Sequence, residues 1–147
     1  SNTISPVANA FFSSLIYNGA CALFSGKKVS DLYDPTIKVK KSALEKHHIF
    51  PKEYLKRKKY DLPVINQIAN LTYLEYLDNI KILDTDPKTY YTQMKDNYFS
   101  GKEAELEDSM IKHGVPYNFF DLDYQEFLIS RRKKIARIIK EHYEKIR

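Results

Sequence analysis

Two short segments with the composition of β-strands, set among longer helical segments, most constrain the fold of this chain. The first runs from Leu44 to Phe50 and is ended by Pro51, which has no backbone N–H for a strand partner. It places His47 and His48 side by side, and neighbouring side chains of a strand point to opposite faces. An adjacent pair is therefore a poor way to build one flat histidine surface.

The second strand is expected at Asn70–Leu74, about twenty residues further along the chain. Capping residues, apolar periodicity and turn residues predict helices for most other segments, and irregular structure for residues 25 to 43. Ser5 as N-cap and Pro6 at the first helical position begin one helix, and Ser100 with Glu103 resembles a capping box. The helices are expected over residues 6–24, 52–59, 75–83, 87–98, 100–112 and 123–146.

The last of these helices is predicted to be amphipathic. Its apolar stripe consists of Leu128, Ile135, Ile139 and Ile146, and this stripe is expected to face the interior. The run from Arg131 to Lys134 is expected to form a charged turn on the outside. Together these elements predict an α+β fold, mostly helical, with one small two-stranded element.

The length of 147 residues fits a single domain, residues 1–147, with a core of its own. The one cysteine, Cys21, excludes an internal disulfide and a CxxC zinc site, which favours a reducing, cytoplasmic compartment. Polar residues interrupt the apolar run from Ala8 to Phe24, so a signal peptide or membrane span is not expected. The chain begins Ser-Asn, and we expect it to be a C-terminal fragment of a longer protein.

The net charge of +5 is unevenly distributed. Residues 27–59 carry eleven Lys/Arg and four Asp/Glu, residues 84–126 carry four and ten, and residues 127–147 carry eight and two. Two basic blocks around an acidic block indicate a surface that binds a polyanion such as nucleic acid. The alternative is that these lysines only form solvated helix faces.

The motif around the histidine pair resembles the HNH nucleases, whose core is the ββα-metal finger. His-His-Ile-Phe-Pro-Lys at 47–52 is followed by Asn-Leu-Thr at 70–72 and by Asn79 in the next predicted helix. This order is similar to the C-terminal nuclease domain of Gmr-type, modification-dependent (type IV) restriction proteins. The flanking helices, including Tyr-x-x-Phe-Leu-x-x-Arg-Arg in the last one, resemble that family more weakly.

The resemblance implies a role for each motif residue. It makes His48 the general base and Asn70 the residue that pins the loop and orients His48. It makes His47 and Asn79 the two metal ligands. The residues expected to contact nucleic acid are Lys52, Lys56, Arg57, Lys58, Lys59 and Lys81.

Two protein ligands leave several positions for water and phosphate, which favours Mg²⁺ or Mn²⁺ over Zn²⁺. Zinc-binding relatives offer extra helical histidines, whereas Leu83 follows one turn after Asn79 here. Members of the family often have Arg or Lys directly after the helical Asn, whereas this chain has Ile80. The basic residue that would contact the phosphate at this position is therefore missing.

The leading hypothesis is a bacterial, metal-dependent DNA endonuclease of a restriction or phage-defence protein. Its partners would be DNA and an N-terminal sensing domain, with no membrane. The alternatives are an RNA-directed nuclease, a helical interaction domain, and a catalytically silent nucleic-acid-binding module that uses Lys27-Lys28, Lys56–Lys59 and Arg131–Lys134. In a purely structural interpretation, His47 and His48 are a partly buried pair whose hydrogen bonds are made to backbone groups. His113 and His142 are assigned no role.

Overall fold

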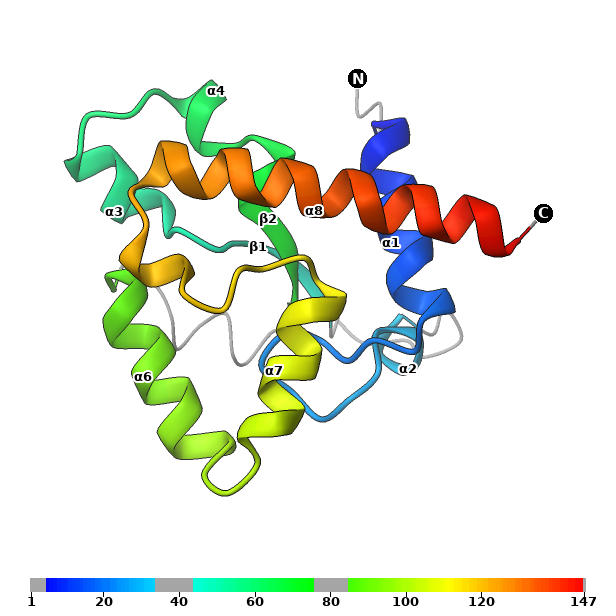
Figure 1. Ribbon diagram of the computed structural model, residues 1–147. Helices are drawn as coiled ribbons and strands as arrows, with labels where there is room; N and C mark the ends of the chain where they lie inside the picture. Colours follow the sequence, from blue (N-terminus) through cyan, green and yellow to red (C-terminus); the bar gives the residue numbers. More distant parts are fainter. Residues whose placement is uncertain (1–4, 34–43, 76–84, 147) are drawn as a thin grey trace.

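The computed structural model of the chain describes residues 5–33, 44–75 and 85–146. It is mostly helical and contains one small antiparallel sheet, which confirms the predicted α+β class (Figure 1). In chain order the elements are α1 (Pro6–Tyr17), α2 (Val29–Leu32), β1 (Leu44–His48), α3 (Lys52–Arg57), α4 (Leu62–Ile65), η1 (Ile68–Asn70), β2 (Leu71–Glu75), α6 (Pro87–Tyr98), α7 (Glu103–Lys112), η2 (Phe119–Asp121) and α8 (Tyr124–Lys145).

The two strands pair in antiparallel register, from Leu44 opposite Glu75 to His48 opposite Leu71. The N–H of Ile49 continues the pairing by donating to the carbonyl of Asn70 at 2.8 Å. Both predicted strands are therefore present. The helix predicted at 75–83, which would complete a ββα unit, lies almost entirely outside the described residues.

The first helix is shorter than predicted, since α1 ends at Tyr17 and not at Phe24. Gly19 has φ +66° and follows the C-cap Asn18. The N–H of Ala20 donates to the carbonyl of Leu15 and that of Gly19 donates to Ile16, the two bonds of a Schellman motif. This turn ends the helix. Beyond it, Cys21 forms an antiparallel β-bridge with Lys28.

The start of α7 and the segment after α3 also differ from the prediction. Ser100 does not cap α7, because Gly101 takes a positive φ of +74° and the helix begins at Glu103. The carboxylate of Glu103 accepts from the N–H of Gly101, at 3.4 Å. The Leu62-Pro63 break instead begins the short helix α4, in which Pro63 occupies a first-turn position that needs no N–H donor.

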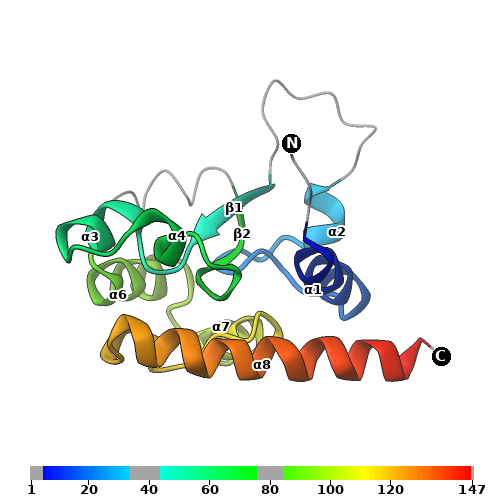
Figure 2. The same cartoon turned by 90° about the horizontal axis from the view of Figure 1, so that it is seen from above.

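The longest helix, α8, runs along one side of the molecule below the sheet and against α1 (Figure 2). Asp123 caps its N-terminus by accepting from the N–H groups of Gln125 and Glu126. The predicted stripe holds for Leu128 and Ile135, whereas Ile146 is 51% exposed. The prediction for Arg131 was wrong, because its side chain is 0% exposed and points into the protein.

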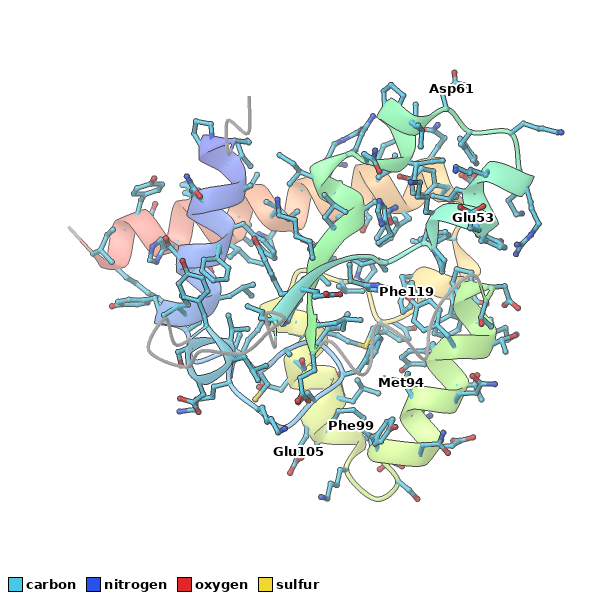
Figure 3. The ribbon with its side chains drawn as sticks, turned by 180° about the vertical axis from the view of Figure 1, so that it is seen from behind. Glu53, Asp61, Met94, Phe99, Glu105 and Phe119 are labelled. Atoms are coloured by element: carbon cyan, nitrogen blue, oxygen red, sulfur yellow. The ribbon has the colours of Figure 1, made fainter. Side chains whose placement is uncertain are left out.

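The main core lies between the sheet end, α6, α7 and the N-terminal half of α8. Met94, Phe99 and Phe119 contribute to it and are labelled in Figure 3. The ring of Phe50, which lies two residues after the end of β1, contacts the rings of Phe119 and Phe127 with centroids 6.2 and 4.7 Å apart. The segment after β1 is therefore anchored by aromatic packing against η2 and α8.

Within the described ranges 5–33, 44–75 and 85–146, no helix is long and apolar enough to cross a membrane.

One residue other than glycine has a positive φ in the described part of the chain, Lys59 at +71°. It ends α3 in the place that glycine usually takes, with the N–H of Tyr60 donating to the carbonyl of Leu55 at 3.2 Å. An L-residue pays about 1 kcal/mol for this conformation.

We therefore expect Lys59→Gly to raise the free energy of unfolding by up to about 1 kcal/mol, measured by urea denaturation. Lys58→Gly is the comparison variant, because it removes the same charge at φ −87°, together with the contact between Lys58 Nζ and the Tyr54 ring. That variant should lower stability. A Lys59→Gly protein that is less stable than the wild type would contradict the account of this turn.

Candidate functional site

The two adjacent histidines of β1 occupy different environments, as strand alternation predicts. His47 is buried, at 4% exposed, and its ring meets the ring of Tyr90 edge-on with centroids 6.2 Å apart. His48 is half-buried at the end of the strand. Of the two histidines, only His48 is therefore partly open to solvent.

The imidazole of His48 is held by a residue outside the predicted motif. Its Nε2 lies 2.8 Å from the Oδ1 of Asn66, which is exposed. An amide oxygen only accepts, so Nε2 of His48 carries the proton in this bond. The lone pair of the neutral ring then lies on Nδ1, the nitrogen that could take a proton from water.

Asn70 is fully buried, and its side chain bonds backbone groups both just after β1 and before β2. Its Oδ1 accepts from the N–H of Phe50 at 2.8 Å, and its Nδ2 donates to the carbonyls of Phe50 and Ile65 at 3.1 and 3.0 Å. Asn70 thus joins the end of β1 to the segment before β2. The side chain that contacts His48 directly is Asn66. Asn70 bonds the backbone of Phe50 and Ile65, and it therefore influences the position of His48 through the backbone.

The expected metal ligands can be placed only in part. His47 lies in β1, whereas Asn79 lies outside the described residues, as do Ile80, Lys81 and Leu83. Among residues 5–33, 44–75 and 85–146, no group of three or more His, Cys, Asp or Glu side chains gathers to hold a metal. An imidazole is, in its neutral form, a ligand for many divalent ions, so the chemistry of the His47 side chain fits the expected role.

The expected phosphate contacts of the described region lie on or directly after α3. They are all exposed: Lys52, Lys56, Arg57, Lys58 and Lys59. Lys56 lies 3.4 Å from the carboxylate of Glu53, and the Nζ of Lys58 lies 5.1 Å from the centroid of the Tyr54 ring. Figure 3 labels Glu53, the acidic residue of this basic helix. Only Pro51 separates α3 from the segment of Ile49 and Phe50, so these cations lie close to His48 in the chain.

Arg131, expected on the surface, is instead a central buried residue of the fold. Its Nε and one terminal nitrogen donate to the carbonyl of His113 at 3.1 and 3.0 Å, and the other donates to the carbonyl of Ala69 at 2.7 Å. Its guanidinium carbon also lies 5.3 Å from the centroid of the Phe11 ring. Burial lowers the pKa of Arg131 to about 9, which leaves it charged at neutral pH. The sequence signal was its position, three residues after Leu128 and four before Ile135.

His113, which is assigned no role from sequence, is fully buried beside Arg131. Its Nε2 donates to the carbonyl of Cys21 at 2.7 Å, and its Nδ1 lies 2.5 Å from the hydroxyl of Thr72 in β2. Burial lowers the pKa of His113, and the nearby charge of Arg131 lowers it further, whereas the hydrogen bond to the Cys21 carbonyl raises it. The resulting pKa is about 4. Its imidazole is therefore neutral, and its Nδ1 accepts a hydrogen bond from the hydroxyl of Thr72.

Comparison with known proteins adds no further assignment to this site. No family model, no curated protein and no solved structure matches the chain. The site consists of a half-buried imidazole held by an amide, a buried asparagine that joins the end of β1 to the segment before β2, and a basic helix next to them in the chain.

The neutral state of His113 makes stability depend on pH. The unfolded chain takes up a proton near pH 6.5, whereas folded His113 stays neutral down to a pKa of about 4. Its contribution is therefore complete above pH 6.5 and is lost as the pH falls toward 4, by about 1.4 kcal/mol per pH unit. Urea denaturation between pH 7 and 5 measures this slope.

His113→Gln is the control, because glutamine keeps a side-chain donor and acceptor and does not titrate. Its stability should vary less with pH across this window. An imidazole resonance of His113 that titrates near pH 6.5 in the folded protein, followed by NMR, would contradict the prediction.

Proposed function

We propose that this chain is a metal-dependent endonuclease domain that hydrolyses phosphodiester bonds of DNA. The observation that carries the proposal is the state of His48. This imidazole lies at the end of a strand, half-buried, with its Nε2–H bound by Asn66 and its Nδ1 left as the basic nitrogen. An exposed helix rich in Lys and Arg follows it.

In the proposed reaction, Nδ1 of His48 takes a proton from the attacking water. The water oxygen forms a bond to phosphorus, and the bond from phosphorus to the 3′ oxygen breaks, which leaves a 5′-phosphate and a 3′-hydroxyl. The 3′ oxygen takes its proton from solvent. Asn66 keeps the ring oriented and stabilises the imidazolium through Nε2–H, and a positioned base of this kind contributes roughly 10²–10⁴ in rate.

A divalent ion, when bound, supplies Lewis-acid stabilisation of the charge on the phosphoryl group and on the leaving oxygen. We propose His47 and Asn79 as its ligands, with Mg²⁺ or Mn²⁺ in preference to Zn²⁺ because two protein ligands leave room for water and phosphate. The side chain of His47 leaves the strand on the face opposite to that of His48. The two imidazoles therefore take separate roles.

The proposed phosphate contacts are the exposed cations of the segment 52–59, with Lys81 as a further candidate. Such contacts fix the position of a nucleic acid and carry no base specificity. On the same resemblance to Gmr-type restriction proteins, we propose that the domain is the nuclease part of a bacterial phage-defence protein. Recognition of the modified base would then belong to an N-terminal sensing domain in the cytoplasm.

A silent nucleic-acid-binding module is the second candidate, and the exposed cations of α3 and α8 favour it equally. The hydrogen bond between Asn66 and His48 supports the hydrolase over this module. A module that only binds has no use for an oriented imidazole, whereas a hydrolase needs one.

The direct test is nicking of supercoiled plasmid with Mg²⁺ or Mn²⁺ and with EDTA. We expect cleavage only with the metal, and a loss of at least about 100-fold in the His48→Ala variant with DNA affinity retained. Lys46→Ala is the matched control, since Lys46 is exposed on the same strand two residues earlier and faces the same side. If the His48→Ala variant nicks the plasmid at nearly the wild-type rate, His48 is not the general base. If the wild type and both variants bind DNA and none of them nicks it, the silent binding module is favoured.

The role of Asn66 gives a separate expectation. Asn66→Ala removes one hydrogen bond, worth about 1.4 kcal/mol, so kcat should fall about tenfold. Asn66→Asp keeps the acceptor and adds a charge that favours imidazolium. The acidic limb of its pH–rate profile should therefore move to higher pH, because the base must be neutral to act.

Asn97→Asp is the matched control, since it adds the same charge at an exposed position on α6. Its pH–rate profile should equal that of the wild type. If neither Asn66 variant changes the rate or the profile, the bond to His48 has no part in the reaction.

A further inference from the structure

A groove of about 580 Å³ lies between the start of α1, η1 and α8. Its floor is apolar and is formed by Ile68 of η1 with Ile135 and Ile139 of α8. Arg132 and Lys140 line the groove from α8 and are both exposed. An apolar floor flanked by two cations fits a ligand that has apolar surface and negative charge in the same stretch.

The charged side of the groove is one straight row on α8. Arg132, Ala136 and Lys140 are spaced four residues apart, which places them above one another on a helix face. The two cations are separated by about 12 Å along the axis, from eight residues at 1.5 Å each. That spacing corresponds to about three to four nucleotides of one DNA strand, at 3.4 Å per step. The small side chain of Ala136 leaves the middle of the row open.

The groove is connected to the candidate base by adjacent residues. Asn66 holds the imidazole of His48, and the next residue, Gln67, lines the groove. The amide oxygen of Gln67 accepts a hydrogen bond from the guanidinium of Arg132. Figure 1 shows α8 crossing the segment between α4 and β2 on its way to α1. A strand bound across His48 could therefore continue into this groove.

The cations of the groove are also available. Among the ion pairs of the described ranges, Lys27, Lys56 and Lys112 have carboxylate partners, and neither Arg132 nor Lys140 is part of one. The bond from Arg132 to Gln67 uses a neutral acceptor, so it leaves the positive charge uncompensated.

We propose that this groove is a nucleic-acid subsite adjoining His48. Phosphates bind Arg132 and Lys140, and a sugar with its base edge packs on Ile68 and Ile139. The inference rests on the proposed nuclease function and adds the path of the strand beyond the site of cleavage. A purely apolar partner would leave two cations desolvated at its edge, and a simple phosphate-binding surface would need no apolar floor.

The test measures binding apart from cleavage. All proteins carry His48→Ala, and affinity for a fluorescent DNA duplex and for its single strand is measured by anisotropy at several salt concentrations. Arg132→Ala with Lys140→Ala should weaken binding at least tenfold and lower the log–log salt slope for the duplex by about 1.8, or 0.9 per contact. The matched control is Lys133→Ala with Arg137→Ala, which removes one Lys and one Arg of α8 that line a different groove.

A second variant tests the apolar floor without a change in charge. Ala136→Trp fills the middle of the groove from an exposed helix position, so the fold should remain intact by circular dichroism. We expect it to lower affinity about tenfold and to leave the salt slope unchanged, because both phosphate contacts are still present.

Equal effects of the two double variants would overturn the proposal, since binding would then depend only on net charge. Unchanged affinity of Ala136→Trp would overturn it as well. So would a concentration-dependent dimer of the parent protein that Ala136→Trp dissociates in sedimentation without loss of DNA affinity, because a second copy would then occupy the groove. Plasmid nicking by protein with an intact His48 is scored separately, so the proposed function can stand where this inference fails.

Discussion

The buried guanidinium of Arg131 is the interaction on which the arrangement of the other elements depends. Hydrogen bonds from a charged donor stabilise by about 1.5–3 kcal/mol each, and Arg131 makes three of them to carbonyls that have left water. The carbonyls belong to His113 at the end of α7 and to Ala69 in η1. One side chain of α8 therefore holds two distant segments of the chain at a defined distance. Its charge is tolerated inside the protein because these dipoles and the Phe11 ring replace solvent.

From Arg131, a series of hydrogen bonds leads to the proposed base. Ala69, which accepts from Arg131, directly precedes Asn70, and Asn70 bonds the backbone of Phe50 and Ile65. These contacts place Asn66 next to His48. His113 also joins two segments, because it bonds the hydroxyl of Thr72 in β2 and the carbonyl of Cys21 in the N-terminal segment. The sheet is short, and a two-stranded sheet has little stability alone, so this buried polar network and the aromatic packing of Phe50 are what hold it in place.

The same arrangement gives a physical basis for the proposed chemistry. A general base must be accessible to water and still be kept in one orientation. Half-burial of His48 provides the access, and the bond to Asn66 provides the orientation. The cations around it lie on two elements, α3 after the strand and α8 beyond Gln67, and the proposed groove joins the second of these to the site. Binding of a polyanion and hydrolysis of it would thus draw on different side chains of one surface.

The sequence by itself determined the class of the fold, both strands and most helices, because these depend on local signals: apolar periodicity, proline positions, and capping by Ser5. It also indicated that His47 and His48 face opposite ways, since alternation is a property of any strand. Glycines with positive φ ended α1 early and delayed α7, which the sequence pattern had not resolved. Only the tertiary structure decided that Arg131 is buried, that His113 is neutral and that Asn66 is the partner of His48. These three facts depend on which residues distant in sequence come together, and a charged residue within an apolar stripe can be read as solvated until its buried acceptors are known.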